Sequence, residues 1–246
     1  MEARYRHIES DLLYLLYDPH MPADLPDPIV HIPLPNPDNP YEANRHLVRP
    51  KGGHLLRPNA KPVSPFTLPK LQKIVFHSYV KEAAHNKSAL VPAIAAARAI
   101  SGSTREGGNI PGLSGVQLVY SRRSLPTWRL REGVAIGVKV EMRGEQMWAF
   151  LNSLIEFVIP RMRDFKGFAL PTSSSSPNTP NNISGTVSVG FPPTAMGLFP
   201  QIEINFDNYP RMYGFHVQFV TDQRGKGAQD RARQLMSAFR IPFVRR

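Results

Sequence analysis

The sequence predicts one mixed α and β domain over residues 70–246, preceded by an extended, proline-rich arm over residues 1–69. Two observations lead to this division. Residues 1–69 hold 13 of the 25 prolines, and from Leu71 onward the hydrophobic residues recur with a period of two in some segments and 3.6 in others. The chain has 246 residues, of which 41% are hydrophobic. This length suffices for one sizeable core, or for one core and an extension.

The arm is predicted from strings such as MPADLPDP and HIPLPNPDNP. Proline fixes φ and removes an amide donor, so these strings cannot form the interior of a sheet or a long helix. Their composition also leaves a disordered linker open as an alternative. Hydrophobic residues at Ile8, Leu12, Leu15 and Leu16 predict a short amphipathic helix near the start. Together with the string IVHIPL, this helix could anchor the arm on a neighbouring surface.

Strands are predicted where hydrophobic residues alternate with polar or small ones. The clearest is VAIGVKVEM, in which Val134, Ile136, Val138, Val140 and Met142 share one face. That face should lie in the core, while the other can be wet or can bind a ligand. Further strands are expected at LQKIVFHSYV, VQLVY, TVSVGF, QIEINF and GFHVQFVT.

Three helices are predicted from hydrophobic residues at a spacing of 3.6. The first is the alanine-rich segment SALVPAIAAARAI, closed by Gly102. The second begins after Gly144, and Pro160 is expected to end it. Its stripe is made of Met147, Phe150, Leu151, Leu154, Ile155 and Val158. Each of these side chains stabilises the fold by roughly 1.5 to 3 kcal/mol when buried, so this helix should pack on the sheet. The third contains Ala228, Ala232, Leu235, Met236 and Phe239.

The charge of the chain indicates a polyanionic partner. The formal net charge is +11 and the isoelectric point is about 10.1. Residues 1–48 carry 3 basic and 8 acidic side chains, net −5, so the remaining 198 residues carry +16. This favours nucleic acid or an anionic membrane surface as the partner of the body, with simple solubility as the alternative. The acidic arm is expected to contact protein rather than RNA.

Several function classes lack their sequence signatures. Cysteine is absent, which excludes disulfides, thiolate metal sites and a cysteine nucleophile. The phosphate-binding, dinucleotide-binding, zinc-protease and serine-hydrolase motifs are missing, and the eight histidines show no ligand spacing. We therefore expect neither an enzyme nor a cofactor or metal. No run of eighteen apolar residues predicts a membrane span, and the acidic start has the pattern of no targeting peptide.

Two basic clusters frame the second predicted helix. Arginine binds phosphate through two parallel hydrogen bonds, and clusters joined by one strand and one helix can converge on one surface. A solvated charged rim is the alternative. The candidate RNA-binding residues are Arg122, Arg123, Arg129, Arg131, Lys139, Arg143, Arg161, Arg163 and Lys166. The string KGFAL imitates a base-stacking strand motif, but Pro171 and four serines follow it, so a central strand is not expected there.

At this point the residues carry a resemblance to a known family. The stretch LREGVAIGVKVEMRGEQMWAFLNSLIEFVIPRMRDFKGF resembles the signature of the universal large-subunit ribosomal protein five family, the 5S rRNA-binding protein of the central protuberance. The likeness includes PKLQKIVFHSYVKEA, FPQIEI, YGFHVQFVT and LMSAFRIPF, in the family's order, from Pro69 to Phe243.

The resemblance implies an α+β domain with an antiparallel sheet and helices packed on one face. It also implies binding to rRNA in the large subunit, close to the P-site tRNA, without catalysis. Carried over by position, the string PRMRDFKG supplies Arg161, Arg163 and Lys166 as cations facing rRNA, with Asp164 orienting an arginine. The string RLREG supplies Arg129 and Arg131.

The chain also departs from the family pattern. His77, Ser78 and Tyr79 stand where the family has an asparagine and glycines, which argues against the usual 5S rRNA contact. The Gly-rich loop STREGGNIPGLSG is longer than the family's turn, and SSSSPNTPNN replaces a glycine-asparagine motif. With the acidic arm, these departures resemble fungal mitochondrial forms, and they imply a place in the mitochondrial matrix. A free RNA-binding factor or a protein adaptor that reuses the fold is the alternative.

Overall fold

The computed structural model describes residues 2–20, 26, 36, 38–41, 59, 61–103, 115–163, 165–170 and 180–245. Most of the proline-rich segment, residues 104–114 of the Gly-rich loop and residues 171–179 of the Ser/Pro/Asn-rich loop therefore lie outside the described residues, as does Asp164.

The centre of the fold is a five-stranded antiparallel sheet with the strand order β2-β3-β1-β6-β5. Its strands are β1 (Leu71–Tyr79), β2 (Val116–Tyr120), β3 (Ala135–Met142), β5 (Thr186–Phe191) and β6 (Phe215–Thr221). A separate pair joins β4 (Phe168–Leu170) in parallel to β7 (Phe243–Arg245). KGFAL thus contributes no central strand, as expected, and the α+β class is confirmed.

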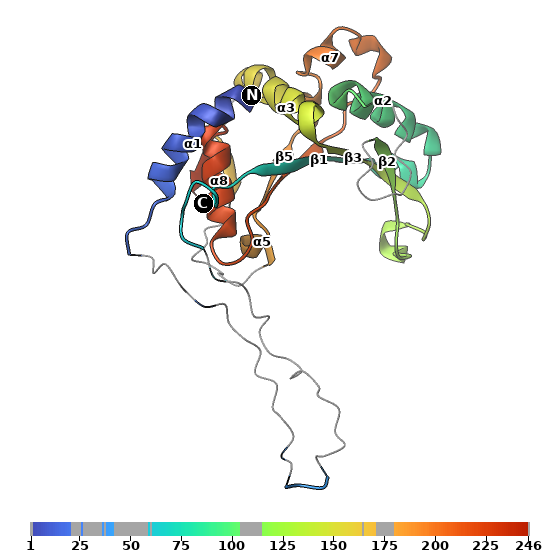
Figure 1. Cartoon of the computed structure of the whole chain (residues 1–246). Helices are drawn as coiled ribbons and strands as arrows, with labels where there is room; N and C mark the ends of the chain where they lie inside the picture. The colour runs from blue at the N-terminus through green and yellow to red at the C-terminus, as the bar shows by residue number, and fades with distance from the viewer. Residues whose placement is uncertain are drawn as a thin grey trace.

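Helices cover one face and one end of this sheet (Figure 1). Helices α2 (Leu90–Ser101) and α3 (Gly144–Ser153) lie above the strands, whereas α8 (Ala228–Ala238) and α1 (Glu2–Leu16) stand side by side at one end. Shorter elements are α4 (Ile159–Arg161), α5 (Pro180–Ile183), α6 (Pro193–Met196) and α7 (Pro200–Glu203). The connections include the 3₁₀ turns η1 (Lys81–Ala84), η2 (Lys87–Ala89), η3 (Pro126–Trp128) and η6 (Phe206–Asn208).

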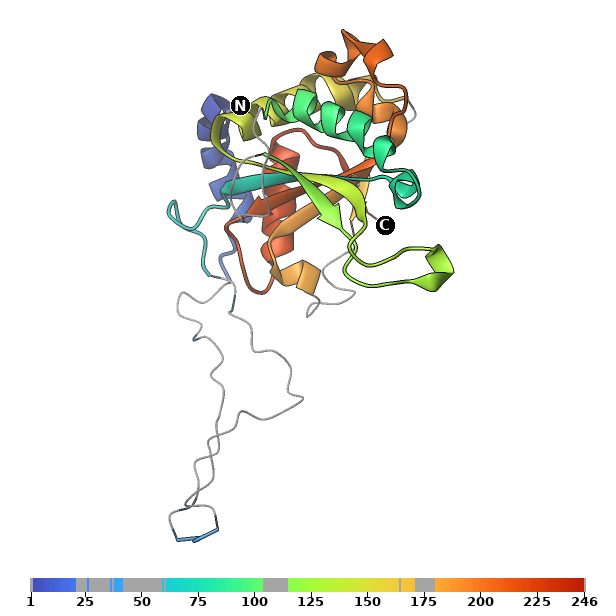
Figure 2. The ribbon, with the colours of Figure 1, turned by 90° about the vertical axis from the view of Figure 1, so that its right-hand side faces the viewer.

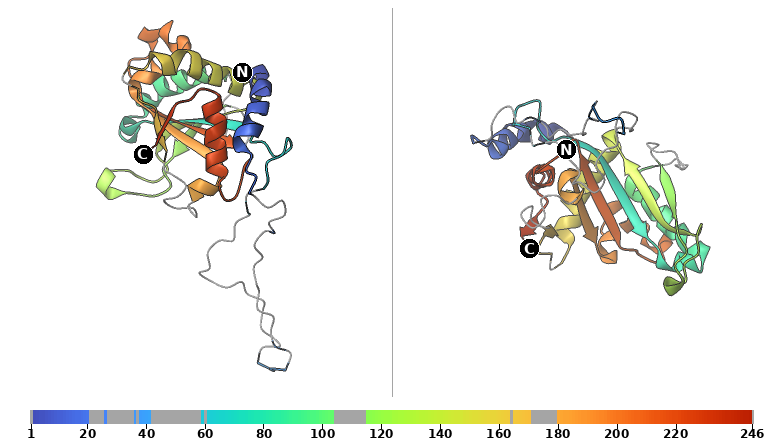
Figure 3. Two further views of the ribbon diagram at one scale, coloured as in Figure 1. Left: turned by 90° about the vertical axis from the view of Figure 1, so that its left-hand side faces the viewer. Right: turned by 90° about the horizontal axis from the view of Figure 1, so that it is seen from below.

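The strands divide their side chains between a core face and an open face. Ile74, Phe76, Val140, Val217 and Phe219 are among the buried side chains that meet the helices. Alternate residues point the other way, as the period of two requires. Seen from below, the strands lie bare between helices at their edges (Figure 3, right). One face of the sheet is therefore available for a partner, as the alternation in residues 134–142 predicts.

Helix α1 corrects the prediction for the arm. The amphipathic helix forms, but Ile8 and Leu12 are buried in the main core, and the helix packs on α8 of its own domain. Tyr5 adds a hydrogen bond of 3.1 Å from its hydroxyl to the carbonyl oxygen of Pro69. An extended arm is therefore wrong for residues 2–16, because a hydrophobic stripe predicts a helix without specifying the surface that covers it.

Two further predictions of secondary structure were wrong in detail. QIEINF forms α7 and a turn instead of a strand, because Pro200 occupies the first helical position and Ile202 is buried. The second predicted helix continues beyond Ser153 through a π-helical segment (η4, Leu154–Val158) into α4. It ends after Arg161 rather than at Pro160, since a proline in the first turn of α4 needs no amide donor.

Candidate nucleic-acid interface

A narrow hairpin extends from the sheet between β2 and β3. Ser121 and Val134 close its base with a hydrogen bond of 2.9 Å from amide to carbonyl, and Leu125 and Leu130 form a bridge near its tip. The tip is the 3₁₀ turn η3, followed by Arg129 with φ 53° and ψ 32°. A non-glycine residue in this left-handed region is uncommon. The backbone therefore holds the tip in one defined turn.

Four of the predicted RNA-binding residues lie on this hairpin. Arg122, Arg123, Arg129 and Arg131 are all exposed, and among the described residues none of them is in an ion pair. Because no carboxylate holds them, their guanidinium groups can contact phosphates without first losing a protein partner. The hairpin thus gathers the first predicted cluster in one place.

The open face of the sheet carries a triad of two lysines and one carboxylate. Lys139 Nζ lies 2.6 Å from Glu141 Oε1, and Lys73 Nζ lies 3.0 Å from Glu141 Oε2. The hydrogen bond from Lys139 lowers the pKa of the Glu141 carboxyl, burial opposes this shift, and Lys73 adds to the lowering. Lys139 is therefore a candidate RNA-binding residue whose charge is already partly compensated.

Two histidines lie beside this triad, on neighbouring strands. His77 is paired with Lys139 in the β1–β3 register and with His216 in the β1–β6 register. Each imidazole lies against a glycine of the next strand, since a Cβ on Gly137 would meet His77 at 3.3 Å and one on Gly190 would meet His216 at 3.2 Å. Burial lowers the pKa of His77, and His216 and Lys139 act in the same direction.

The three residues that depart from the family pattern differ in what they face. His77 lies on the open face and Tyr79 is exposed at the end of β1. Ser78, by contrast, is fully buried and donates a hydrogen bond of 3.0 Å to the carbonyl oxygen of Gly214. Ser78 therefore cannot contact a partner on the open face, because successive side chains of a strand alternate between its faces.

The second predicted cluster is not uniform. Arg163 and Lys166 are exposed. Arg161 instead forms a two-fold ion pair with Glu203 of α7, at 2.6 and 2.8 Å. The hydrogen bonds from Arg161 lower the pKa of the Glu203 carboxyl. Arg161 thus joins α4 to α7 in this structure, and a phosphate would have to compete with a carboxylate for it.

The structure does not bring the two clusters onto one surface. Helix α7, which holds Arg161, lies above the sheet, whereas the 121–134 hairpin hangs below it (Figures 1 and 2). Arg143 is exposed at the start of α3, at the end of β3 that is remote from the hairpin. The predicted residues are therefore distributed over the hairpin, the open sheet face and the α3–α4 layer.

Some residues of the interface were missed from the sequence. Lys73, His216 and Gln218 share the open face with Lys139, and Trp128 stands exposed at the hairpin tip. The signal was the polar half of each alternating strand, which becomes a surface only once the strands are placed in register. Among the described residues, no helix is long and apolar enough to cross a membrane, and no group of acidic and histidine side chains could hold a metal.

Comparisons with known proteins identify the family. Residues 135–243 match the model for the C-terminus of the ribosomal protein uL5 family. The chain is 37% identical over 188 residues to large ribosomal subunit protein uL5m of Schizosaccharomyces pombe, covering 76% of this chain and 59% of that protein. It is 32% identical over 184 residues to uL5m of Reclinomonas americana, covering 75% and 88% of the two chains. It is 33% identical over 176 residues to uL5 of Magnetococcus marinus, covering 72% and 81%.

This chain thus spans less than two thirds of the Schizosaccharomyces protein but most of the Reclinomonas and Magnetococcus proteins. Both the strands of the sheet and the helices on its core face fall within the span of the resemblance, from Pro69 to Phe243. The family expected from the sequence is therefore confirmed, and the chain belongs to the large ribosomal subunit protein uL5 family.

Proposed function

We propose that this protein is a structural constituent of the large subunit of the mitochondrial ribosome, located in the mitochondrial matrix. The observation that supports this most strongly is the match over three quarters of the chain to relatives named as mitochondrial large-subunit proteins. Membership of this family favours a structural role over an enzymatic one. The protein would bind large-subunit rRNA in the central protuberance, near the P-site tRNA, and so support translation.

Two surfaces are proposed to contact the RNA. The hairpin offers Arg122, Arg123, Arg129 and Arg131 without competing carboxylates, and the open sheet face offers Lys73, Lys139 and the exposed His216. Arginine and lysine contacts to phosphate position a protein on RNA and make its affinity fall with salt. Arg143, Arg163 and Lys166 are exposed as well and are kept as candidates on a separate surface.

The large rRNA is proposed as the RNA partner, without a 5S rRNA. His77 and Tyr79 support this, because they place rings where the family has small residues, and a ring keeps an RNA backbone further away than glycine does. The net charge of −5 over residues 1–48 supports contacts with neighbouring ribosomal proteins for the part of this segment beyond α1.

The test is a sucrose-gradient profile of a mitochondrial lysate, made at low and at high salt. A ribosomal constituent stays with the large subunit at high salt, whereas a free RNA-binding factor or an adaptor washes off and moves to the top of the gradient. Sequencing the RNA extracted from the same particle fraction tests the second proposal. A stoichiometric 5S species cross-linked to residues 77–79 would overturn it.

A further inference from the structure

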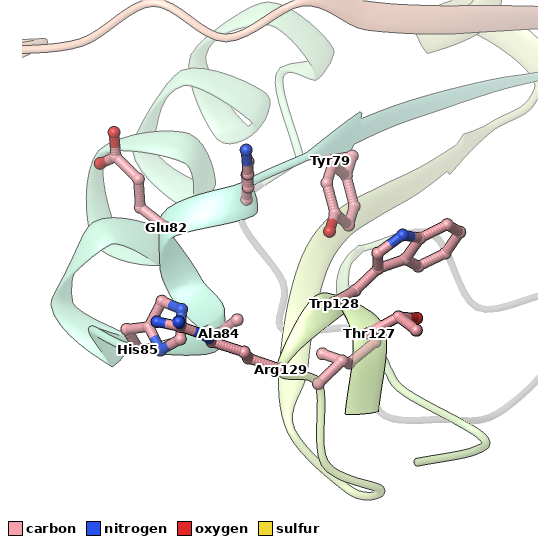
Figure 4. A pocket seen from close by; sticks show the side chains of 9 residues that line it. Tyr79, Glu82, Ala84, His85, Thr127, Trp128 and Arg129 are labelled. Carbon is pink, nitrogen blue, oxygen red and sulfur yellow. The ribbon is translucent and has the colours of Figure 1, made fainter. Parts of the chain in front are cut away.

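A cleft opens between the hairpin and the loop that follows β1. Its volume is about 840 Å³, and its walls come from two stretches of chain, residues 79–85 and 127–130 (Figure 4). This volume lies within the range of sites that hold small molecules or cofactors, roughly 300 to 1,000 Å³. Neither stretch is long, and the cleft exists because β3 pairs with β1 while the hairpin extends past the end of β1.

Two aromatic side chains stand on one side of the cleft. Tyr79 is 48% exposed and Trp128 is 74% exposed, and Figure 4 shows their rings close to each other at its rim. Within the described part of the chain, neither ring is stacked on another aromatic ring. Both rings therefore have apolar faces that water covers in the isolated protein, and a flat ligand could cover them instead.

The opposite side of the cleft is basic. Lys81, His85 and Arg129 line it, and Figure 4 shows His85 and Arg129 across from the aromatic rim. Glu82 is the one acidic residue among the lining residues, and its carboxylate is held in an ion pair by Arg211. A ligand with a flat ring and a negative charge would thus find both complements in the same cleft.

The two walls are fixed before any ligand arrives. The Trp128 amide donates a hydrogen bond of 3.1 Å to the Leu125 carbonyl, and the Arg129 amide donates one of 3.0 Å to the Pro126 carbonyl. On the other wall, the Val80 amide donates to the carbonyl of Ile136 at 2.9 Å. Holding Arg129 at positive φ costs on the order of 1 kcal/mol, and such strain persists where the surrounding structure fixes the residue.

We infer that this cleft binds one unpaired nucleobase of RNA, stacked against Trp128 and Tyr79, with its flanking phosphates on Lys81 and Arg129. The inference rests on the proposed function, since it names how the hairpin of a ribosomal protein meets RNA. Single-stranded RNA is recognised in this way by aromatic platforms beside basic grooves, and stacking tolerates any base. A base from rRNA and one from tRNA have the same chemistry here.

The first experiment uses the fluorescence of Trp128 in the full-length protein. The chain has two tryptophans, and Trp148 is half-buried against Tyr5 and Phe239, so the difference between the wild type and Trp128→Phe isolates Trp128. The probe is a 12-nucleotide single-stranded RNA, and the control is an abasic strand with the same number of phosphates. We expect the RNA to quench Trp128 and the abasic strand to leave it unchanged. Equal quenching by both strands would overturn the inference.

Affinity for the same RNA separates an aromatic role from a merely apolar one. Trp128→Leu should weaken binding roughly ten-fold, as expected for the loss of one stacked base, whereas Trp128→Phe should retain most of the affinity. Because this side chain is largely exposed, neither variant should unfold the protein. A Trp128→Leu variant that binds as tightly as Trp128→Phe would contradict base stacking.

The second experiment identifies the source of the base in purified particles. Ultraviolet cross-linking followed by sequencing of the attached nucleotide distinguishes an rRNA base from a tRNA base at residues 79 and 128. Cross-links confined to the arginines of the hairpin would overturn the inference. The gradient profile remains an independent readout: a protein that fails to sediment with ribosomes yet is quenched only by base-containing RNA disproves the proposed function and keeps the cleft.

Discussion

Glu141 is expected to oppose two properties of this protein, its stability and its affinity for RNA. The carboxylate side chain is only 11% exposed and joins Lys73 to Lys139 on the open sheet face. In Glu141→Gln the shape is retained and the charge is lost. The fold then loses an ion-pair triad, while two lysines gain freedom to contact phosphate. We predict a less stable protein that binds RNA more tightly.

The loss of stability follows from the exposure of the three side chains. Breaking a fully buried pair costs about 3 to 5 kcal/mol, whereas an exposed pair is worth about 0.2 to 1 kcal/mol. The lysine side chains are 28% and 35% exposed, so this triad lies between these limits, at about 1 to 2 kcal/mol. Thermal unfolding should shift downward by on the order of 5 °C in a domain of this size.

The pH dependence has a definite sign. The pKa of Glu141 is lowered in the folded state, so its stabilisation is present above the unfolded value, near 4.5, and is lost as the pH falls through the folded pKa. The wild type should therefore lose stability faster than Glu141→Gln below about pH 4.5. At neutral pH the formal charge of the triad rises from +1 to +2, so the salt dependence of RNA binding should steepen by about 0.7 to 0.9 in the logarithmic slope.

Glu156→Gln is the matched control, because Glu156 is exposed in the helix layer and its oxygen accepts a hydrogen bond from Asn152 that a glutamine can also accept. It makes the same change in net charge away from the sheet. Calorimetry and salt titrations of RNA binding should show both effects for Glu141→Gln and neither for the control. Equal RNA affinity in the two variants would show that the open sheet face is not an RNA surface.

Three other predictions test the remaining parts of the structure. Leu12→Ala should lower the free energy of unfolding by about 3 kcal/mol in denaturant titrations, and Leu15→Ala, at an exposed position, by less than about 0.5 kcal/mol; equal values would place α1 outside the core. The double variant Arg163→Glu and Lys166→Glu should reduce sedimentation with the large subunit without changing thermal stability, and unchanged incorporation would make this surface a solvated rim. Arg129→Gly should raise stability by about 1 kcal/mol through relief of positive φ while weakening RNA binding, and a destabilised variant would contradict the left-handed turn.

Much of the fold could be predicted because local patterns coincide with the final packing. Residues 116–120 and 135–142 alternate, and both are strands with one face in the core. The glycine at the end of α2, Gly102, adopts φ 64°, the left-handed conformation expected of a helix stop. In these segments the local pattern and the tertiary contacts favour the same structure.

The errors arose where a distant contact decides the outcome. QIEINF alternates as a strand does, yet Phe199 beside it packs on Phe150 and Phe215, with ring centroids 5.9 Å apart in each pair, and the segment turns into α7. Arg161 and its partner Glu203 are 42 residues apart, so no local pattern reveals that this cation already has a carboxylate. For the same reason, the open face was foreseen as a strand face but not as a set of side chains.

The distribution of paired and unpaired cations points to an order of contact with RNA. On the sheet, Lys73 and Lys139 share Glu141, so RNA must either displace that carboxylate or accept a weaker field there. On the hairpin, the arginines have no such competitor among the described residues, and Trp128 adds an apolar surface at the tip. Displacing a carboxylate costs free energy that an unpaired guanidinium does not require. The hairpin should therefore set the affinity of first contact, and the sheet face should engage only where the RNA shape brings phosphate against both lysines at once.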